Sequence, residues 1–336
     1  MDPLSQGSLG AAVAASPARR VELRAGAFAG LLAGLAPDLD VLIRSSADPL
    51  LFLEYHRQFS HALVFVPVGA MLCAAGLYPL MRRWLSVRRL LIYCLLGYGS
   101  HGLLDACTSY GTQLLWPFSE VRVAWNVVSV VDPLFTVPLM LALAVSVAAR
   151  RRGWAMLGLA WATLYLGVGQ VQQWRAEQAA LALASGRGHQ ADSMLVKPAF
   201  GNLVLWKSVY RSGGWYYVDA LRAGMAVTAF PGERVRVLEE DPRWSAPAAG
   251  SRQRRDLERF QRFSAGYLAL AEHDPDLIVD VRYSLVPNRI DPLWGIRLRP
   301  GTPDRHARFE TDRETTAADR AALGRMLFGS GDPIGR

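Results

Sequence analysis

The sequence predicts an all-α, multi-pass membrane domain of about five transmembrane helices, followed by an extracytoplasmic α+β domain. Three observations support this fold class. Almost all long apolar runs lie before residue 171. Short arginine clusters flank these runs, which is the pattern that sets the topology of membrane proteins. After residue 171, short stretches alternate apolar and polar residues, as strands of a globular domain do.

Composition narrows the class of protein further. The chain has 336 residues, of which 51% are hydrophobic, and its formal net charge is +8. Because the basic residues cluster beside apolar runs, this charge indicates membrane topology and not nucleic-acid binding. Cys73, Cys94 and Cys107 lie in apolar segments without paired spacing. We therefore expect neither a disulfide framework nor a zinc site built from cysteines.

The first apolar run is expected to cross the membrane. Residues 1–18 are small and polar, so we expect them to be disordered, and the membrane domain then covers 19–170. Arginines at 19–24 precede the apolar run, as in a secretory signal peptide, but Pro37 directly after the run is a poor context for cleavage. An uncleaved first span over 25–43 is the preferred interpretation.

Four more predicted spans follow, each near the roughly 20 apolar residues that a bilayer requires. They cover residues 61–81, 90–107, 127–149 and 154–170. The arginines at 82–89 and 150–152 belong with the N-terminal arginines on the cytoplasmic side by the positive-inside rule. The loops over 44–60 and 108–126 and the domain over 171–336 are then outside. In a bacterium, this is the outer face of the inner membrane.

The domain over 171–336 is predicted to contain both strands and a helix. Strand-like stretches cover 202–211, 215–221, 276–285 and 293–298, and a helical pattern rich in Arg and Glu covers 252–272. Gly213 and Gly214 separate the first two strands and suit a tight hairpin turn.

Seven ionisable residues gather near one membrane face when the chain is threaded through a bilayer. They are Asp38, Asp40, His56, His61, His101, Asp105 and Asp132. Titratable groups at membrane depth are energetically costly and usually mark a functional site. A mixture of His and Asp from several segments supplies the ligands that a metal-dependent hydrolytic centre needs.

His101 and Asp105 form the sharpest local feature. Their i, i+4 spacing places both side chains on one face of the third span, where they could ligate the same metal ion or adjacent ions. A His–Asp hydrogen bond that only stabilises helix packing is an equal alternative.

His56 and His61 form a second feature, with Arg57 and Ser60 between them. Their five-residue offset does not place both on one helical face, but Ser60 suits the N-cap of a helix beginning at His61. His56 on the incoming loop could then turn toward the same point, and Arg57 offers forked donors suited to a phosphate. The alternative is an interfacial His and Arg that face lipid head groups.

Asp38 and Asp40 form a third feature. Because side chains at i and i+2 diverge, one carboxylate is expected to ligate metal while the other orients a histidine, and Asp40 is preferred as the ligand. Both could instead end the first helix at the water interface. Asp132 precedes Pro133 and could be a ligand, a group behind the ligands or a helix-start residue.

Four motifs together resemble the YdjM-like inner-membrane proteins, also called the DUF457 family and described as membrane-bound metal-dependent hydrolases. The motifs are Pro-Asp-Leu-Asp at 37–40, His-Arg-x-x-Ser-His at 56–61, Gly-Tyr-x-Ser-His-x-x-x-Asp at 97–105 and Leu-Leu-Trp-Pro-Phe at 114–118. This family is distantly similar to zinc-dependent phospholipase C and the S1/P1 nucleases, in which a His-x-x-x-Asp pair helps to bind zinc. His101 and Asp105 match that pair, and Asp40 with one of His56 or His61 resembles the upstream Asp and His.

The residues and the resemblance together predict a hydrolase that uses one or two zinc ions to activate water against a phosphoester. The predicted zinc ligands are Asp40, His61, His101 and Asp105, with His56 and Asp38 as further ligands or orienting groups. Arg57 is expected to neutralise phosphate charge, and Asp38 or Asp132 to accept the proton of water. A site at the outer ends of the spans suggests a membrane lipid or a lipid-linked substrate.

Two other classes of function compete with this prediction. A non-catalytic membrane protein would use a structural metal or a polar network to hold its helices, while its C-terminal domain binds a partner. A transporter would use the same His and Asp side chains as a metal or proton pathway. Transport predicts polar groups across the whole membrane thickness, and the inner halves of the predicted spans nearly lack them.

Overall fold

The computed structural model describes residues 1–329 and 332–333, so the last residues of the domain predicted over 171–336 lie partly outside the described residues. The chain divides into two compact units, which we call the helical unit and the sheet unit. The helical unit comprises Met1–Leu42, Tyr55–Gln170 and Phe200–Asn202, and the sheet unit comprises Ile43–Glu54, Val171–Ala199 and Leu203–Arg336.

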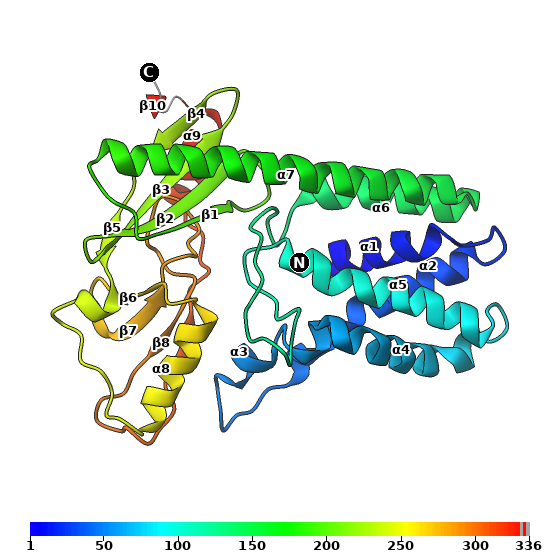
Figure 1. Ribbon diagram of the computed structural model, residues 1–336, viewed down its shortest axis with the longest axis horizontal. Helices are drawn as coiled ribbons and strands as arrows, with labels where there is room; N and C mark the ends of the chain where they lie inside the picture. Colours follow the sequence, from blue (N-terminus) through cyan, green and yellow to red (C-terminus); the bar gives the residue numbers. More distant parts are fainter. Residues whose placement is uncertain (330–331, 334–336) are drawn as a thin grey trace. The chain divides into compact units, whose positions relative to one another are not determined.

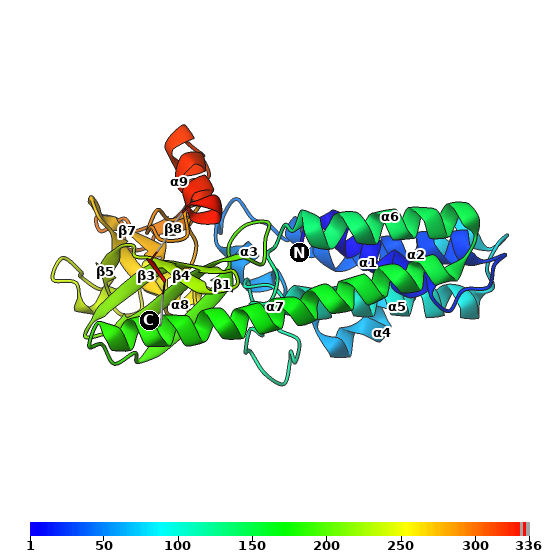
Figure 2. The same cartoon turned by 90° about the horizontal axis from the view of Figure 1, so that it is seen from above.

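The helical unit is a bundle of apolar helices (Figure 1). Its elements are α1 (Pro3–Ala15), α2 (Leu23–Leu35), η1 (Ala36–Leu42), η2 (Phe59–His61), η3 (Leu63–Phe65), α4 (Val66–Met81), α5 (Val87–Ala106), α6 (Pro133–Ala149) and the first part of α7 (Arg152–Gly186). The turns that join α1 to α2, α4 to α5 and α6 to α7 lie at one end of the bundle in the two views (Figures 1 and 2). η1, which follows α2, and the last turn of α5 are therefore at the other end.

The expectation of a disordered N-terminus was wrong, because α1 is a helix with most of its residues buried. Asp2 caps it by accepting hydrogen bonds from the Leu4 and Ser5 amides, and Pro3 occupies the first turn. Both are strong helix-start signals. The small residues of α1 are buried because they allow the helix to pack closely against α2 and α5.

Glycines make this close packing possible at the crossing of α1, α2 and α5. A Cβ built on Gly30 would lie 2.3 Å from the Ala14 Cβ and 2.5 Å from the Gly10 carbonyl oxygen. A Cβ on Gly97 of α5 would lie 2.3 Å from the Gly30 carbonyl oxygen. Small residues let helix backbones approach closely in membrane proteins. This crossing holds the ends of α2 and α5 together, and these ends carry the functional residues described below.

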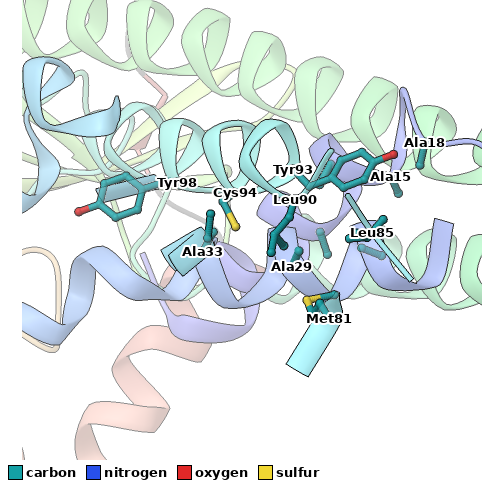
Figure 3. Close-up of a cluster of buried hydrophobic side chains, with 14 of the residues drawn as sticks. Ala15, Ala18, Ala29, Ala33, Met81, Leu85, Leu90, Tyr93, Cys94 and Tyr98 are labelled. Atoms are coloured by element: carbon teal, nitrogen blue, oxygen red, sulfur yellow. The ribbon is translucent and has the colours of Figure 1, made fainter. Parts of the chain in front are cut away.

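A buried hydrophobic cluster surrounds the crossing (Figure 3). Leu90, Tyr93 and Cys94 of α5 are fully buried in it, together with Ala29 and Ala33 of α2. The large side chains of α5 thus fill the space that the small residues of α2 leave free.

We expect Gly30→Ala to destabilise the helical unit strongly. Overpacking of a dense core costs about 1–3 kcal/mol, and here the new methyl group meets backbone that cannot rotate away. The matched control is Gly76→Ala in α4, because a Cβ there meets nothing within 4 Å and alanine favours a helix over glycine. Thermal unfolding of the detergent-purified variants measures the difference, and equal melting temperatures would refute the proposed packing role of Gly30.

Within the described residues, three helical stretches are long and apolar enough to cross a membrane: Leu23–Leu42, Leu63–Met81 and Arg152–Gly186. α6 is apolar but shorter. Its first residue is Pro133, so the span predicted over 127–149 was predicted to begin too early. The span predicted over 154–170 was too short, because α7 continues to Gly186. α5 has 20 residues, which corresponds to a length of about 30 Å, but its charged and polar residues lower its hydropathy.

The sheet unit contains, within the described residues, two antiparallel sheets. The first has the order β1 (Ser193–Pro198), β2 (Leu205–Ser212), β3 (Trp215–Ala223), β4 (Val227–Phe230) and β10 (Asp332–Pro333), with β5 (Arg234–Arg236) also paired to β3. The second has the order β6 (Leu268–Ala271), β7 (Asp274–Asp280), β8 (Trp294–Arg297) and β9 (Arg308–Thr311). The helices that lie wholly within this unit are η4 (Leu238–Glu240), α8 (Arg252–Phe263) and α9 (Ala317–Phe328), and α7 continues into it from Val171.

The predicted hairpin in this unit is confirmed. β2 pairs with β3, and Gly213 and Gly214 form the turn between them. Their φ angles are 56° and 78°, and a two-residue type I′ turn requires positive φ at both positions. The helix predicted over 252–272 was too long. It ends at Phe263 because Ala265 and Gly266 adopt positive φ angles, and the chain then continues as β6.

Residues 43–54 belong to the sheet unit, although they lie in the sequence between two segments of the helical unit. They contain most of α3 (Leu51–Tyr55). Arg259 of α8 lies 2.9 Å from an Asp48 carboxylate oxygen and 2.8 Å from one of Glu54, and the ring centroids of Phe52 and Phe309 are 5.0 Å apart. These contacts anchor the segment to strands and a helix far away in the sequence.

Candidate metal centre

Four side chains from three elements converge at the end of the helical unit opposite the arginine-rich turns. Asp38 lies on η1, His61 on η2, and His101 and Asp105 on the last two turns of α5. One ligand atom from each lies within 4.8 Å of the others. We call these four residues the inner group.

The distances within the inner group are those of a compact ligand set. The Nε2 atoms of His61 and His101 are 3.0 Å apart, and each is 3.4 Å from Asp38 Oδ1. Asp105 Oδ2 lies 3.2 Å from His61 Nε2 and 3.6 Å from His101 Nε2. The histidines and Asp105 are fully buried, whereas the Asp38 side chain is 25% exposed. Asp38 therefore marks the side from which solvent reaches the group.

Hydrogen bonds orient both imidazole rings toward the centre. His101 Nδ1 is 2.6 Å from the Gly34 carbonyl oxygen, which can only accept, so Nδ1 carries the proton. His61 Nδ1 is 3.0 Å from Ser60 Oγ and 3.3 Å from Asp40 Oδ2. A proton on each Nδ1 leaves each Nε2 with a lone pair directed at the other ligand atoms.

This arrangement fits a bound cation. Two nitrogen lone pairs and two carboxylate oxygens converge, and such acceptors repel one another unless positive charge lies between them. Within residues 1–329, Asp105 Oδ2 is a buried atom without a hydrogen-bond partner. Imidazole and carboxylate together are typical zinc ligands. The residues present therefore fit a divalent metal ion.

A second group consists of Asp38, Asp40 and His56. The two groups share Asp38. Asp40 of this second group accepts hydrogen bonds from the Arg57 amide at 3.0 Å and from Ser60 Oγ at 2.7 Å. Its Oδ1 also lies 2.8 Å from His56 Nδ1. Because protein donors already engage Asp40, the distances favour Asp38 as the inner ligand and Asp40 as the group that orients the histidines.

Ser60 does not cap the second span, in contrast to the prediction from the sequence. It lies in η2, and α4 begins only at Val66. Its hydroxyl donates instead to Asp40, as described above, because that carboxylate is a stronger acceptor than a neutral group.

Arg57 lies beside the inner group, with a residue exposure of 4%. Its Nε is 3.2 Å from Asp105 Oδ2, its Nη1 donates to Thr108 Oγ1 at 3.1 Å, and its guanidinium covers the Tyr110 ring at 5.1 Å. The residue adopts a positive φ of 62°, which is uncommon for a side chain of this size. The fixed cation thus compensates part of the negative charge of Asp105.

Asp132 belongs to neither group of candidate ligands among the described residues. Its carboxylate accepts from the Leu134 amide at the start of α6 and from the Tyr165 hydroxyl, at 3.1 Å and 2.8 Å. Of the open interpretations of Asp132, the geometry favours the helix-start residue. The other six residues predicted to converge do lie together.

Gln6 of α1 also belongs to the site, although no motif in the sequence pointed to it. Its side-chain amide donates to Asp105 Oδ1 at 2.9 Å, and the amino group of Met1 donates to the same carboxylate oxygen. The signal that could have revealed α1 is the Asp2-Pro3 helix start, which placed residues 3–15 in a helix and Gln6 one turn inside it.

The chain is similar in sequence to several known proteins. A sequence model of the YdjM inner membrane protein family matches residues 1–176. The chain is 24% identical to the uncharacterized protein YfhP of Bacillus subtilis (strain 168) over 261 residues, which is 76% of each chain. It is 34% identical to the inner membrane protein YbcI of Escherichia coli (strain K12) over 109 residues, which cover 31% of this chain and 61% of YbcI. No solved structure matches the chain.

Proposed function

Because the chain belongs to the YdjM inner membrane protein family, we propose that its His and Asp cluster makes it a membrane-bound, metal-dependent hydrolase of phosphoester bonds. The observation that carries this proposal is the convergence of His61, His101, Asp38 and Asp105 on one point. A lipid or lipid-linked substrate suits a site at the end of an apolar helical bundle.

One or two zinc ions fit the two ligand groups. His61, His101 and Asp105 would hold one ion, Asp40 and His56 would lie around a second, and Asp38 is the residue common to both groups. When bound, zinc would lower the pKa of water and polarise a phosphoryl oxygen.

The remaining residues have distinct roles in this proposal. With a metal ion on Asp38 Oδ1, the other oxygen of this partly exposed carboxylate would be better placed than Asp132 to accept a proton from water. Asp132 is engaged by Tyr165. Asp40 holds His56 and His61 in position, and Arg57 supplies positive charge that stabilises Asp105 and a phosphate nearby.

The proposed topology follows from the charged turns. Five spans with the arginine-rich turns in the cytoplasm would place the metal centre at the extracytoplasmic end of the helical unit. The same topology would place the domain after the fifth span outside the cytoplasm.

The direct test combines metal content with activity. Detergent-purified wild type and a His101→Ala/Asp105→Ala variant are compared by metal mass spectrometry and by hydrolysis of a chromogenic phosphodiester and of phospholipids. We expect stoichiometric zinc and hydrolysis in wild type only, with loss of activity on chelation and recovery on addition of zinc. Zinc without any hydrolysis would overturn the enzymatic proposal.

A non-catalytic structural metal site is the second candidate function. The observation that favours it is the full burial of His61, His101 and Asp105, because structural zinc sites are closed whereas catalytic sites keep an open position. In that case, chelation would lower the melting temperature sharply, and no substrate would be hydrolysed.

A further inference from the structure

Five arginines line a pocket at the end of the helical unit that is opposite the metal centre. Arg19 and Arg20 come from the turn between α1 and α2, and Arg150, Arg151 and Arg152 come from the junction of α6 and α7. Together with Ala18, Leu23 and Gly153 they line an open pocket of about 340 Å³. We call this the arginine pocket.

The pocket has unbalanced positive charge. Within residues 1–329, none of its five guanidinium groups forms an ion pair with a carboxylate. Like charges that line one pocket repel one another, and a bound anion would reduce this repulsion. Guanidinium groups also match the oxygens of a phosphate with paired N–H donors.

Hydrogen bonds to backbone groups hold the α6–α7 junction and the α1–α2 turn in place despite this repulsion, and in the turn the Glu22 amide donates to the Arg19 carbonyl oxygen at 2.9 Å. Arg150 ends α6 in the left-handed conformation, and the Arg151 amide donates to the Ser146 carbonyl oxygen at 3.1 Å. The Ser146 hydroxyl donates back to the Arg151 carbonyl oxygen at 3.0 Å. Arg24 of α2 donates to the Val147 carbonyl oxygen at 3.1 Å, which joins α2 to the end of α6. The pocket is therefore a built feature of the bundle.

Exposed apolar side chains lie next to the arginines in the chain. Val21 is 85% exposed, and Trp154, Met156 and Leu157 on the first turns of α7 are 42%, 54% and 56% exposed. A free inorganic anion would gain nothing from such side chains. An amphiphile can contact both the arginines and the apolar side chains, and so gains binding free energy from each. Tryptophan beside basic residues is also typical of the membrane interface.

We propose that the arginine pocket binds the phosphate-bearing head group of an anionic phospholipid, whose acyl chains lie against the exposed apolar side chains of α7. The five cations supply affinity for the phosphate, and the apolar residues of α7 select a lipid over a free anion. This site is independent of the metal centre.

The test measures lipid binding by native mass spectrometry of the full-length protein in detergent, with added phosphatidylglycerol. We expect Arg151→Gln/Arg152→Gln to weaken binding by about tenfold or more, since each basic residue near an anionic head group contributes on the order of 1 kcal/mol. The matched control is Arg82→Gln/Arg83→Gln, whose arginines are exposed and lie on the α4–α5 turn at the same end, outside the pocket. Arg19→Gln/Arg20→Gln provides a second pocket variant if the first folds poorly.

Three results would overturn the proposal. Equal weakening in the pocket and control variants would mean that general charge, and not the pocket, attracts the lipid. Equal binding of phosphatidylcholine by wild type would mean that the acyl chains alone are recognised. Displacement of phosphatidylglycerol by an equal concentration of inorganic phosphate would mean that the site takes a free anion.

Discussion

Asp105→Asn is expected to reduce the affinity for the bound metal by more than about a hundredfold, which exceeds the usual cost of losing a group that only orients a ligand. The substitution keeps the shape of the side chain but removes the charge of Oδ2, which lies 3.2 Å from His61 Nε2. Competition with a zinc-sensitive dye measures the affinity in detergent.

Asp132→Asn is the matched control for this prediction. Asp132 and Asp105 are both buried carboxylates of the helical unit, with exposures of 0%, but Asp132 is held by Tyr165 and lies outside the candidate ligand groups. We expect this variant to keep its metal. If both variants keep it, Asp105 is not a ligand of the bound metal.

Arg57→Met is expected to lower the free energy of unfolding of the metal-free protein by about 3–5 kcal/mol, the cost of breaking a buried ion pair. The substitution leaves Asp105 buried without its guanidinium partner, which lies 3.2 Å away. Addition of zinc should restore much of the lost stability, because the ion supplies the missing positive charge. Denaturant titration in detergent, with and without a chelator, measures both effects.

Arg57→Lys is the appropriate comparison, since it keeps the charge but loses the bond from Nη1 to Thr108. We expect its stability to lie between those of wild type and Arg57→Met. If Arg57→Met and wild type unfold alike in chelator, the ion pair does not stabilise the fold. A loss of hydrolysis without a loss of stability would instead indicate that the guanidinium acts on the substrate.

Local patterns in the sequence were sufficient for several features. The apolar runs predicted the helical N-terminal region, and the alternating pattern predicted four of the strands of the C-terminal region, with the hairpin at Gly213 and Gly214 in the expected place. The spacing of His101 and Asp105 sets them on one helical face whatever the tertiary structure is. The motifs between 37 and 118 were enough to indicate the YdjM family, because they depend on residue identity and spacing alone.

Other features depended on contacts between distant residues. α1 has small side chains and little apolar surface of its own, so its burial follows from the glycines of α2 and α5 and not from its own pattern. The role of Gln6 follows from that burial. Asp38 and Asp40 are two residues apart on one turn, and only the positions of His61 and the end of α5 distinguish the inner ligand from the orienting group.

The sequence by itself therefore determined which residues could bind a metal and which segments could cross a membrane, since both follow from side-chain chemistry and local periodicity. Tertiary structure alone decided that six of the seven predicted residues meet while Asp132 caps α6. It also decided that five arginines from two turns share one pocket, and that residues 43–54 pack on Arg259 and Phe309. The physical reason is that these arrangements depend on helix crossings and long-range ion pairs, which join residues far apart in the chain and leave no periodic signal within any one segment.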